Sequence, residues 1–116
     1  MKWYRMHLTE QGIAVFTVEV ASLVSSNIPA LRQNAILADL ATSRRVVIDL
    51  GALRYFDVRG FTEILRWVAQ AEDAGDVRVC SESPEVHALL ELLRGPLLLT
   101  CYESRQKALS SMVRDE

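Results

Sequence analysis

The sequence has few of the features that mark particular classes of protein. Its 116 residues include two cysteines and two histidines, His7 and His87, in no spacing typical of a zinc site. The net charge is only −2, and acidic and basic residues are interspersed, which argues against a nucleic-acid-binding surface. No apolar run approaches the roughly 18 residues that a membrane-spanning helix needs. We therefore expect no metal site, no bound nucleic acid and no membrane insertion.

The N-terminal segment lacks the apolar stretch of a signal peptide, because the first five residues lead directly into alternating apolar and polar positions. Without an export signal, Cys80 and Cys101 are expected to be reduced thiols near strand ends, although one disulfide would be the alternative in an exported protein. The resulting prediction is a cytoplasmic protein.

The composition is that of one ordinary globular domain. Half of the residues are apolar and 24% are charged, as in soluble globular proteins. A chain of this length can bury one core but is short for two. We predict a single domain over residues 1–116, with a frayed polar tail after about residue 112.

Five short segments have the pattern of β-strands, since each is rich in apolar or β-branched residues. They span residues 3–8, 13–20, 45–50, 77–80 and 97–101. The first two are expected to form a hairpin, and the last an edge strand. The nearly continuous apolar run at 45–50 suits a strand that is covered on both faces. Residues 53–56 are expected to be a short link.

Four segments have helical periodicity and begin after residues that can cap a helix. They span about 28–41, 58–74, 84–93 and 105–112. The first is predicted to turn Leu31, Ala35, Ala38 and Leu40 inward. The order ββαβαβαβα predicts an α/β fold, in which helices pack on a mixed β-sheet and the strand–helix–strand units give parallel pairs.

The helix at 58–74 has two separate faces. Its apolar stripe, expected to be buried, consists of Phe61, Ile64, Leu65, Val68 and Ala71. The opposite stripe, expected to be solvated, consists of Arg59, Glu63, Arg66, Gln70 and Asp73. Gly75 stands where a helix-ending glycine is typical.

The chain from about residue 43 to 113 resembles STAS domains, the family of bacterial anti-sigma factor antagonists. The resemblance lies in the strand that contains Asp49, the helix start Asp57-Val58-Arg59-Gly60, the Ser83-Pro84-Glu85 that opens the next helix, and a final helix that begins with a serine. The first 42 residues match more loosely. There, Ala21-Ser22-Leu23-Val24 stands where many members have Gly-x-Leu-Asp, so a second acidic position is absent.

This resemblance implies a non-enzymatic domain that binds a partner protein. In the family the helix start usually reads Asp-Ser-Ser-Gly or Asp-Ser-Thr-Gly, and its first serine is phosphorylated, which adds close to two negative charges. Val58 occupies that position and cannot be phosphorylated. We expect an anti-sigma factor antagonist without this switch, and a serine-kinase anti-sigma factor as its partner.

The expected partner-binding surface covers the start of the 58–74 helix. Its residues are Asp57, Val58, Arg59, Gly60, Thr62 and Glu63. Asp57 has a second expected role as the helix cap. Arg59 opposes the helix dipole, and an ion pair with Glu63 would account for it. The alternative is a positive site that selects an acidic partner or an anion.

More specific expectations attach to Gly60, Thr62 and Asp49. Gly60 costs about 1 kcal/mol against alanine within a helix, which indicates a close approach by backbone or partner. Thr62 is the nearest remaining hydroxyl and is expected to be half buried. Asp49 is a secondary site residue, and its alternative role is local hydrogen bonding, because an unpaired buried carboxylate is costly.

Other functions of small α/β domains require particular residues. A phosphorylated receiver domain needs an acidic pair and a lysine in a late strand, whereas Glu10 and Glu19 stand alone and Lys107 lies in a predicted helix. No Gly-x-Ser-x-Gly motif is present, so neither an enzyme nor a cofactor is predicted. A cytoplasmic STAS subunit of a lipid-type ABC transporter, bound to the transporter ATPase, stays open. So do a small-ligand sensor and a homodimer.

Overall fold

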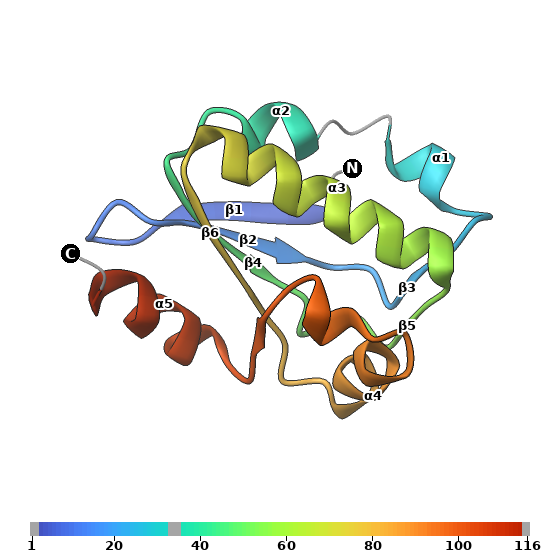
Figure 1. Ribbon diagram of the computed structural model, residues 1–116. Coiled ribbons are helices and arrows are strands. Elements are labelled where there is room, and N and C mark those ends of the chain that lie inside the picture. The colour runs from blue at the N-terminus through green and yellow to red at the C-terminus, as the bar shows by residue number, and fades with distance from the viewer. Residues whose placement is uncertain (1–2, 33–35, 115–116) are drawn as a thin grey trace.

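A five-stranded mixed sheet forms the centre of the domain (Figure 1). The computed structural model describes residues 3–32 and 36–114. The sheet has the order β1 (Tyr4–Leu8), β2 (Ala14–Val18), β4 (Arg45–Asp49), β6 (Asp76–Cys80) and β7 (Cys101–Tyr102). β1 and β2 form the predicted antiparallel hairpin, and every other neighbouring pair is parallel. The predicted mixed sheet is therefore confirmed.

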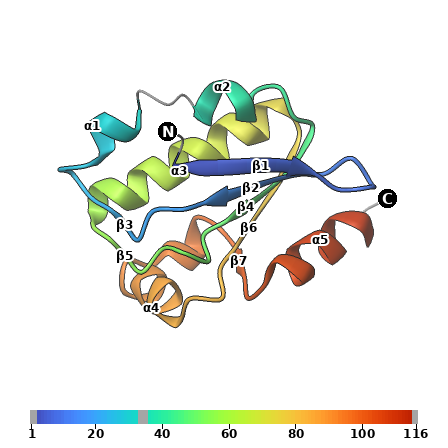
Figure 2. The same cartoon turned by 180° about the vertical axis from the view of Figure 1, so that it is seen from behind.

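Helices cover both faces of this sheet. They are α1 (Ile28–Leu31), α2 (Ile36–Leu40), α3 (Val58–Ala74), α4 (Pro84–Leu92) and α5 (Arg105–Arg114). α2 and α3 lie on one face and α5 on the other (Figure 2). The core on the α3 side includes Phe16, Ile48 and Trp67, whereas Val47 and Ala108 belong to the smaller core under α5. β4 is thus covered on both faces, as its apolar run predicts.

A second, two-stranded sheet occupies the place where only a link was expected. β3 (Ser22–Leu23) and β5 (Tyr55–Phe56) pair in parallel. Leu23 and Phe56 are buried, and the Phe56 and Phe61 rings stack with centroids 6.1 Å apart. This small sheet holds the start of α3 against the segment after β2.

The predicted helix at 28–41 is wrong as one continuous element. α1 and α2 are separate short helices, and Ala35 lies outside the described residues. Ala38 is exposed, whereas Ile36 and Leu40 are buried. Asn27, the residue before α1, can cap a helix, but its side chain makes no capping hydrogen bond. It accepts instead from the Val24 N–H and donates to the Ser22 carbonyl, both at 2.9 Å.

The predicted strand at 97–101 is also wrong over most of its length. Gly95–Leu97 forms a 3₁₀ turn, η1, and β7 contains only two residues. The backbone N–H groups of Leu98 and Leu99 both donate to the Gly95 carbonyl, at 2.8 and 2.9 Å, so this segment bonds to itself rather than to β6. The last helix, α5, extends to Arg114, beyond its predicted end at about residue 112.

Candidate functional site at the start of helix α3

Asp57 caps α3 and joins it to the loop after β3. Its Oδ1 accepts a hydrogen bond from the Gly60 N–H at 2.8 Å, as the sequence predicts. Its Oδ2 accepts from the backbone N–H and the hydroxyl of Ser25, at 3.1 and 3.2 Å. The hydrogen bonds from Gly60 and Ser25 hold the pKa of the Asp57 carboxyl below its usual value. The carboxylate therefore fixes the helix start in its ionised form.

Gly60 is required by the close approach of α3 to β3. A Cβ atom at this position would lie 1.9 Å from the carbonyl oxygen of Leu23 and 2.9 Å from the Cβ of Phe56. Because the first contact is with backbone, no side-chain rotation relieves it. The close approach predicted at Gly60 is thus made by the backbone of this chain, at Leu23. This packing positions the first turn of α3, which carries Val58.

An apolar and hydroxyl-bearing surface surrounds the helix start. Val58 is 64% exposed and Tyr55, three residues earlier, is 51% exposed. Thr62 is exposed rather than half buried, and its hydroxyl donates to the Val58 carbonyl at 3.0 Å. Ser25 is also exposed. We call Ser25, Tyr55, Val58, Arg59 and Thr62 the α3-start surface.

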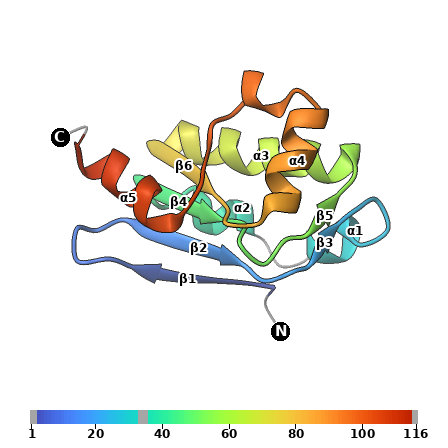
Figure 3. The same cartoon turned by 90° about the horizontal axis from the view of Figure 1, so that it is seen from below.

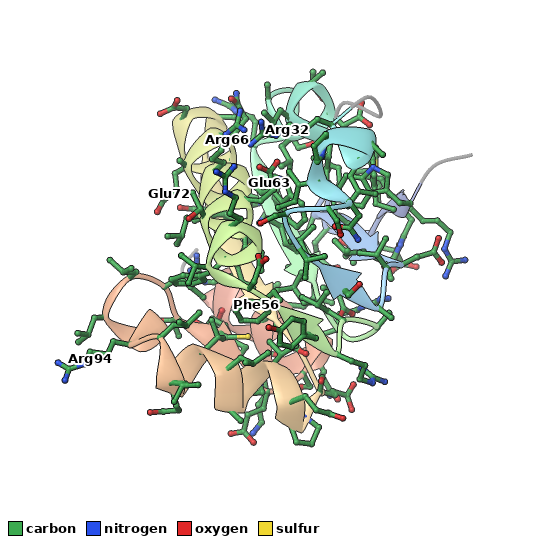
Figure 4. The ribbon with its side chains drawn as sticks, turned by 90° about the vertical axis from the view of Figure 1, so that its right-hand side faces the viewer. Arg32, Phe56, Glu63, Arg66, Glu72 and Arg94 are labelled. Carbon is green, nitrogen blue, oxygen red and sulfur yellow. The ribbon has the colours of Figure 1, made fainter. Side chains whose placement is uncertain are left out.

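Glu63 does not belong to a solvated stripe, which corrects the sequence prediction. Its side chain is only 6% exposed, although those of Arg32 and Arg66 are 54% and 44% exposed. Its Oε1 pairs with Arg32 at 2.9 Å and with Arg66 at 3.4 Å, and its Oε2 accepts from Trp67 Nε1 at 3.3 Å (Figure 4). Glu63 is therefore an internal anchor between α1 and α3 and cannot itself contact a partner.

Arg59 is exposed, and within the described part of the chain its guanidinium has no carboxylate partner. The expected i, i+4 pair with Glu63 is not formed, because that carboxylate is bound to Arg32 and Arg66. The first turn of α3 contains no acidic residue and its last turn no basic residue. Glu72 and Asp73 stand near its C-terminal end and are exposed. Arg59 near the start and Glu72 and Asp73 near the end thus oppose the helix dipole, whereas the ionised Asp57 at the cap favours it.

Asp49 has the local hydrogen-bonding role that was its alternative. Its Oδ1 accepts from Gly51 N–H at 2.8 Å, and its Oδ2 pairs with Arg105 Nε of α5 at 2.8 Å. A second nitrogen of Arg105 donates to the Thr17 hydroxyl at 2.9 Å. The Asp49–Arg105 pair therefore links β2, β4 and α5, and the partners of Asp49, Gly51 and Arg105, are not residues of the α3-start surface.

The cysteines and histidines form no reactive cluster in the described residues. Cys80 and Cys101 are free thiols, as the sequence predicts. Burial raises the pKa of both, that of Cys101 to about 12, so neither is a ready nucleophile. His87 Nε2 donates to the Ser81 carbonyl at 2.7 Å. Residues 3–32 and 36–114 contain no group of three metal-ligating side chains.

Sequence reasoning missed three contributors to this region: Ser25, Tyr55 and Arg32. Ser25 and Arg32 come from a segment some thirty residues before α3, so α3's own periodicity says nothing about them. One signal was present in the helix. Trp67 stands four residues after Glu63, on the same side, and a large apolar residue there indicates a covered flank.

The comparisons with known proteins agree with this architecture. A sequence model of the STAS domain matches residues 5–108. A search of curated protein sequences gave no significant match. None of the helices in the described residues is both long and apolar enough to cross a membrane.

Several solved structures share the fold. An anti-sigma factor antagonist from Mycobacterium paratuberculosis has a TM-score of 0.75 at 20% identity, over 93% of this chain and 91% of that one. An anti-sigma-factor antagonist (STAS) domain protein from Planctomyces limnophilus has a TM-score of 0.73 at 25% identity, over 97% and 98%. The anti-sigma factor antagonist SpoIIAA in its unphosphorylated form has a TM-score of 0.58 at 14% identity, over 96% and 97%. Since the sequence match covers most of the chain and the fold agrees, the chain belongs to the STAS domain family.

Proposed function

We propose that this domain is a regulatory protein-binding module of the anti-sigma factor antagonist type, which docks through the α3-start surface without a serine switch at its helix start. The observation that carries the proposal is the 64% exposure of Val58 at the position of the family's phosphorylated serine. A side chain that is apolar and exposed there favours a dry contact with a partner. The family membership and the names of the structural neighbours support a protein partner.

The chemistry of the surface supports a protein ligand of mixed character. Val58 and Tyr55 offer apolar and aromatic area, and tyrosine is enriched in protein interfaces. Arg59 adds a positive charge that no described carboxylate neutralises. A partner with an apolar contact ringed by acidic groups would complement both features.

The surface is also held rigid before binding. Asp57 ties the helix start to Ser25 with two hydrogen bonds, and Gly60 packs directly against the backbone of Leu23. A preorganised surface binds without the entropy cost of ordering loops. These contacts suit a domain that stays competent for binding.

The test is capture of the partner by tagged protein from soluble and detergent-solubilised fractions of the source cells, followed by mass spectrometry. Wild type is compared with Val58→Asp, which places a charge at the centre of the surface. The matched control is Val113→Asp, since Val113 is another exposed valine (42%) on a helix at the opposite face. Circular dichroism verifies that all three proteins fold.

A serine-kinase-like anti-sigma factor captured by wild type and Val113→Asp, but lost by Val58→Asp, would support the proposal. Equal capture by all three would contradict the assigned surface. Capture of an ATPase together with its permease would instead move the protein to the transporter-subunit alternative.

A further inference from the structure

β1 is an open edge of the central sheet. It pairs with β2 on one side, and within the described residues no strand lies along its other side. Figure 3 shows β1 as the outermost element, with neither helix nor strand beyond it. An unpaired edge presents backbone N–H and C=O groups that another strand can bind.

The phase of the hairpin determines which backbone groups point outward. Thr9 N–H donates to Ile13 and Glu19 N–H donates to Trp3, at 2.9 and 2.8 Å, so the odd-numbered residues of β1 bond to β2. Since hydrogen-bonded positions alternate along an antiparallel pair, Met6 and Leu8 direct their N–H and C=O groups away from β2. These two residues offer two donors and two acceptors.

The same two residues carry exposed apolar side chains. Met6 is 47% exposed and Leu8 is 67% exposed, and both border a surface hollow with Ala14 and Thr42. The edge lacks several of the usual protections against pairing, because β1 contains no proline, lysine or bulge and its one charged side chain is Arg5. Its Arg5 is neutralised within the chain by Glu19 at 2.7 Å.

We propose that β1 is a self-association edge, at which a second copy of this chain pairs antiparallel with β1 to form a continuous sheet across a two-fold axis. A two-fold axis through His7 places Met6 of each chain opposite Leu8 of the other. The outward groups of both residues then form four hydrogen bonds, in the phase that the hairpin imposes. This register uses only Met6 and Leu8 from each strand.

The side chains also favour a second copy as the occupant. Met6 and Leu8 of one chain meet Leu8 and Met6 of the other on one face of the joined sheet, and both lose their exposure. On the opposite face Arg5 stands beside Thr9 of the other copy, and its ion pair with Glu19 stays available. The edge is therefore complementary to itself in backbone and in side chains. An unrelated segment would need apolar side chains at the same alternate positions.

The first test is the solution mass of the 13.0 kDa chain by sedimentation velocity over a range of concentrations. Wild type is expected to form dimers. Leu8→Lys should raise the dissociation constant about tenfold or more, because an edge lysine opposes pairing. Leu92→Lys is the matched control: Leu92 is 78% exposed at the end of α4, and its substitution should leave the dimer unchanged.

The second test is disulfide trapping, which reads the register. Residues at the axis in a non-hydrogen-bonded pair have Cα atoms about 4.5 Å apart, within the roughly 4.4–6.8 Å range of disulfides. His7→Cys is therefore expected to give a covalent dimer under mild oxidation. Arg5→Cys is the control, since two such cysteines would lie roughly 13 Å apart. The native thiols are buried or half buried and do not compete.

Two results would overturn the proposal. One is a wild-type protein that stays monomeric up to about 1 mM. At that concentration, half of the chains would be dimeric even if the dissociation constant were as weak as about 1 mM. The other is a dimer that is insensitive to Leu8→Lys and is not trapped by His7→Cys. The proposal stands apart from partner docking, because β1 contributes no residue to the α3-start surface.

Discussion

Glu63 and Arg32 form an ion pair of 2.9 Å, although 31 positions separate them in the chain. The carboxylate is buried and the guanidinium is half exposed, so the arginine covers the acid from the solvent side. Trp67 and Arg66 complete its hydrogen bonding from within α3. This contact fastens the end of α1 to the second turn of α3, directly after the α3-start surface.

The first prediction concerns this anchor. Glu63→Ala should lower the free energy of unfolding by about 1–3 kcal/mol, because Trp67 Nε1 loses its buried acceptor and two arginines lose their partner. Urea denaturation followed by tryptophan fluorescence measures the change. Glu72→Ala, an exposed glutamate on the same helix, should change stability by no more than about 0.5 kcal/mol. Equal effects of the two substitutions would show that the Glu63 contacts contribute nothing.

The second prediction concerns the packing of α3 on β3. Helix propensity alone would make Gly60→Ala stabilising by about 1 kcal/mol. Instead we expect a loss of about 1–3 kcal/mol, because the new methyl group would overlap the Leu23 carbonyl. Gly51→Ala is the control, since its Cβ would meet side-chain atoms of Asp49, the nearest an oxygen at 3.0 Å, and in the described part of the chain no backbone atom beyond its two chain neighbours lies within 4 Å. A more stable Gly60→Ala protein would contradict the close approach.

The sheet and the longer helices were predictable because their signals are local. The hairpin, the run at 45–50 and the caps at Asp57, Ser83 and Ser104 each depend on residues within a few positions. Gly75 was predicted at the end of α3 for the wrong reason. Its backbone is extended rather than left-handed, and glycine is needed because a Cβ would lie 2.0 Å from the Arg44 carbonyl.

The candidate site was only partly predictable because half of it comes from elsewhere in the chain. The cap and the exposed valine follow from the residues at 57–60, but the Ser25 and Arg32 contacts depend on how the preceding segment folds back over α3. The prediction that Glu63 is solvated considered only its angular position on α3. It was wrong because Arg32, at the end of α1, covers that side of the helix. The leucines at 97–99 failed as a strand for a different reason, since the Gly95 carbonyl captures two of their N–H groups.

The third prediction is a pH dependence of stability that arises from Asp57. Hydrogen bonds from Gly60 and Ser25 place its pKa below that of the unfolded chain. Its contribution is therefore complete above the unfolded value of about 4, and is lost as the pH falls through the lower folded pKa. Asp57→Asn keeps a capping oxygen but does not titrate.

The stability difference between wild type and Asp57→Asn should accordingly favour wild type near neutral pH and shrink as the solution is acidified below about pH 4. Urea unfolding at a series of pH values measures it. A difference that stays constant across this range would mean that the ionised carboxylate has no advantage over the neutral form at the helix start.

The last prediction separates stability from binding at the two ends of α3. Arg59 in the first turn and Asp73 near the last both oppose the helix dipole. Arg59→Glu and Asp73→Lys should therefore each raise the free energy of unfolding by about 0.3–1 kcal/mol in low salt, as measured by urea denaturation. The two substitutions are matched, because each reverses one exposed charge on the same helix.

Only Arg59 belongs to the α3-start surface, so only Arg59→Glu should weaken capture of the partner, whereas Asp73→Lys should leave it unchanged. A residue that lowers stability but strengthens partner binding is an example of the trade-off between stability and function. If both substitutions stabilised the protein and neither affected capture, Arg59 would have no part in recognition, and the contact would depend on the other residues of the α3-start surface.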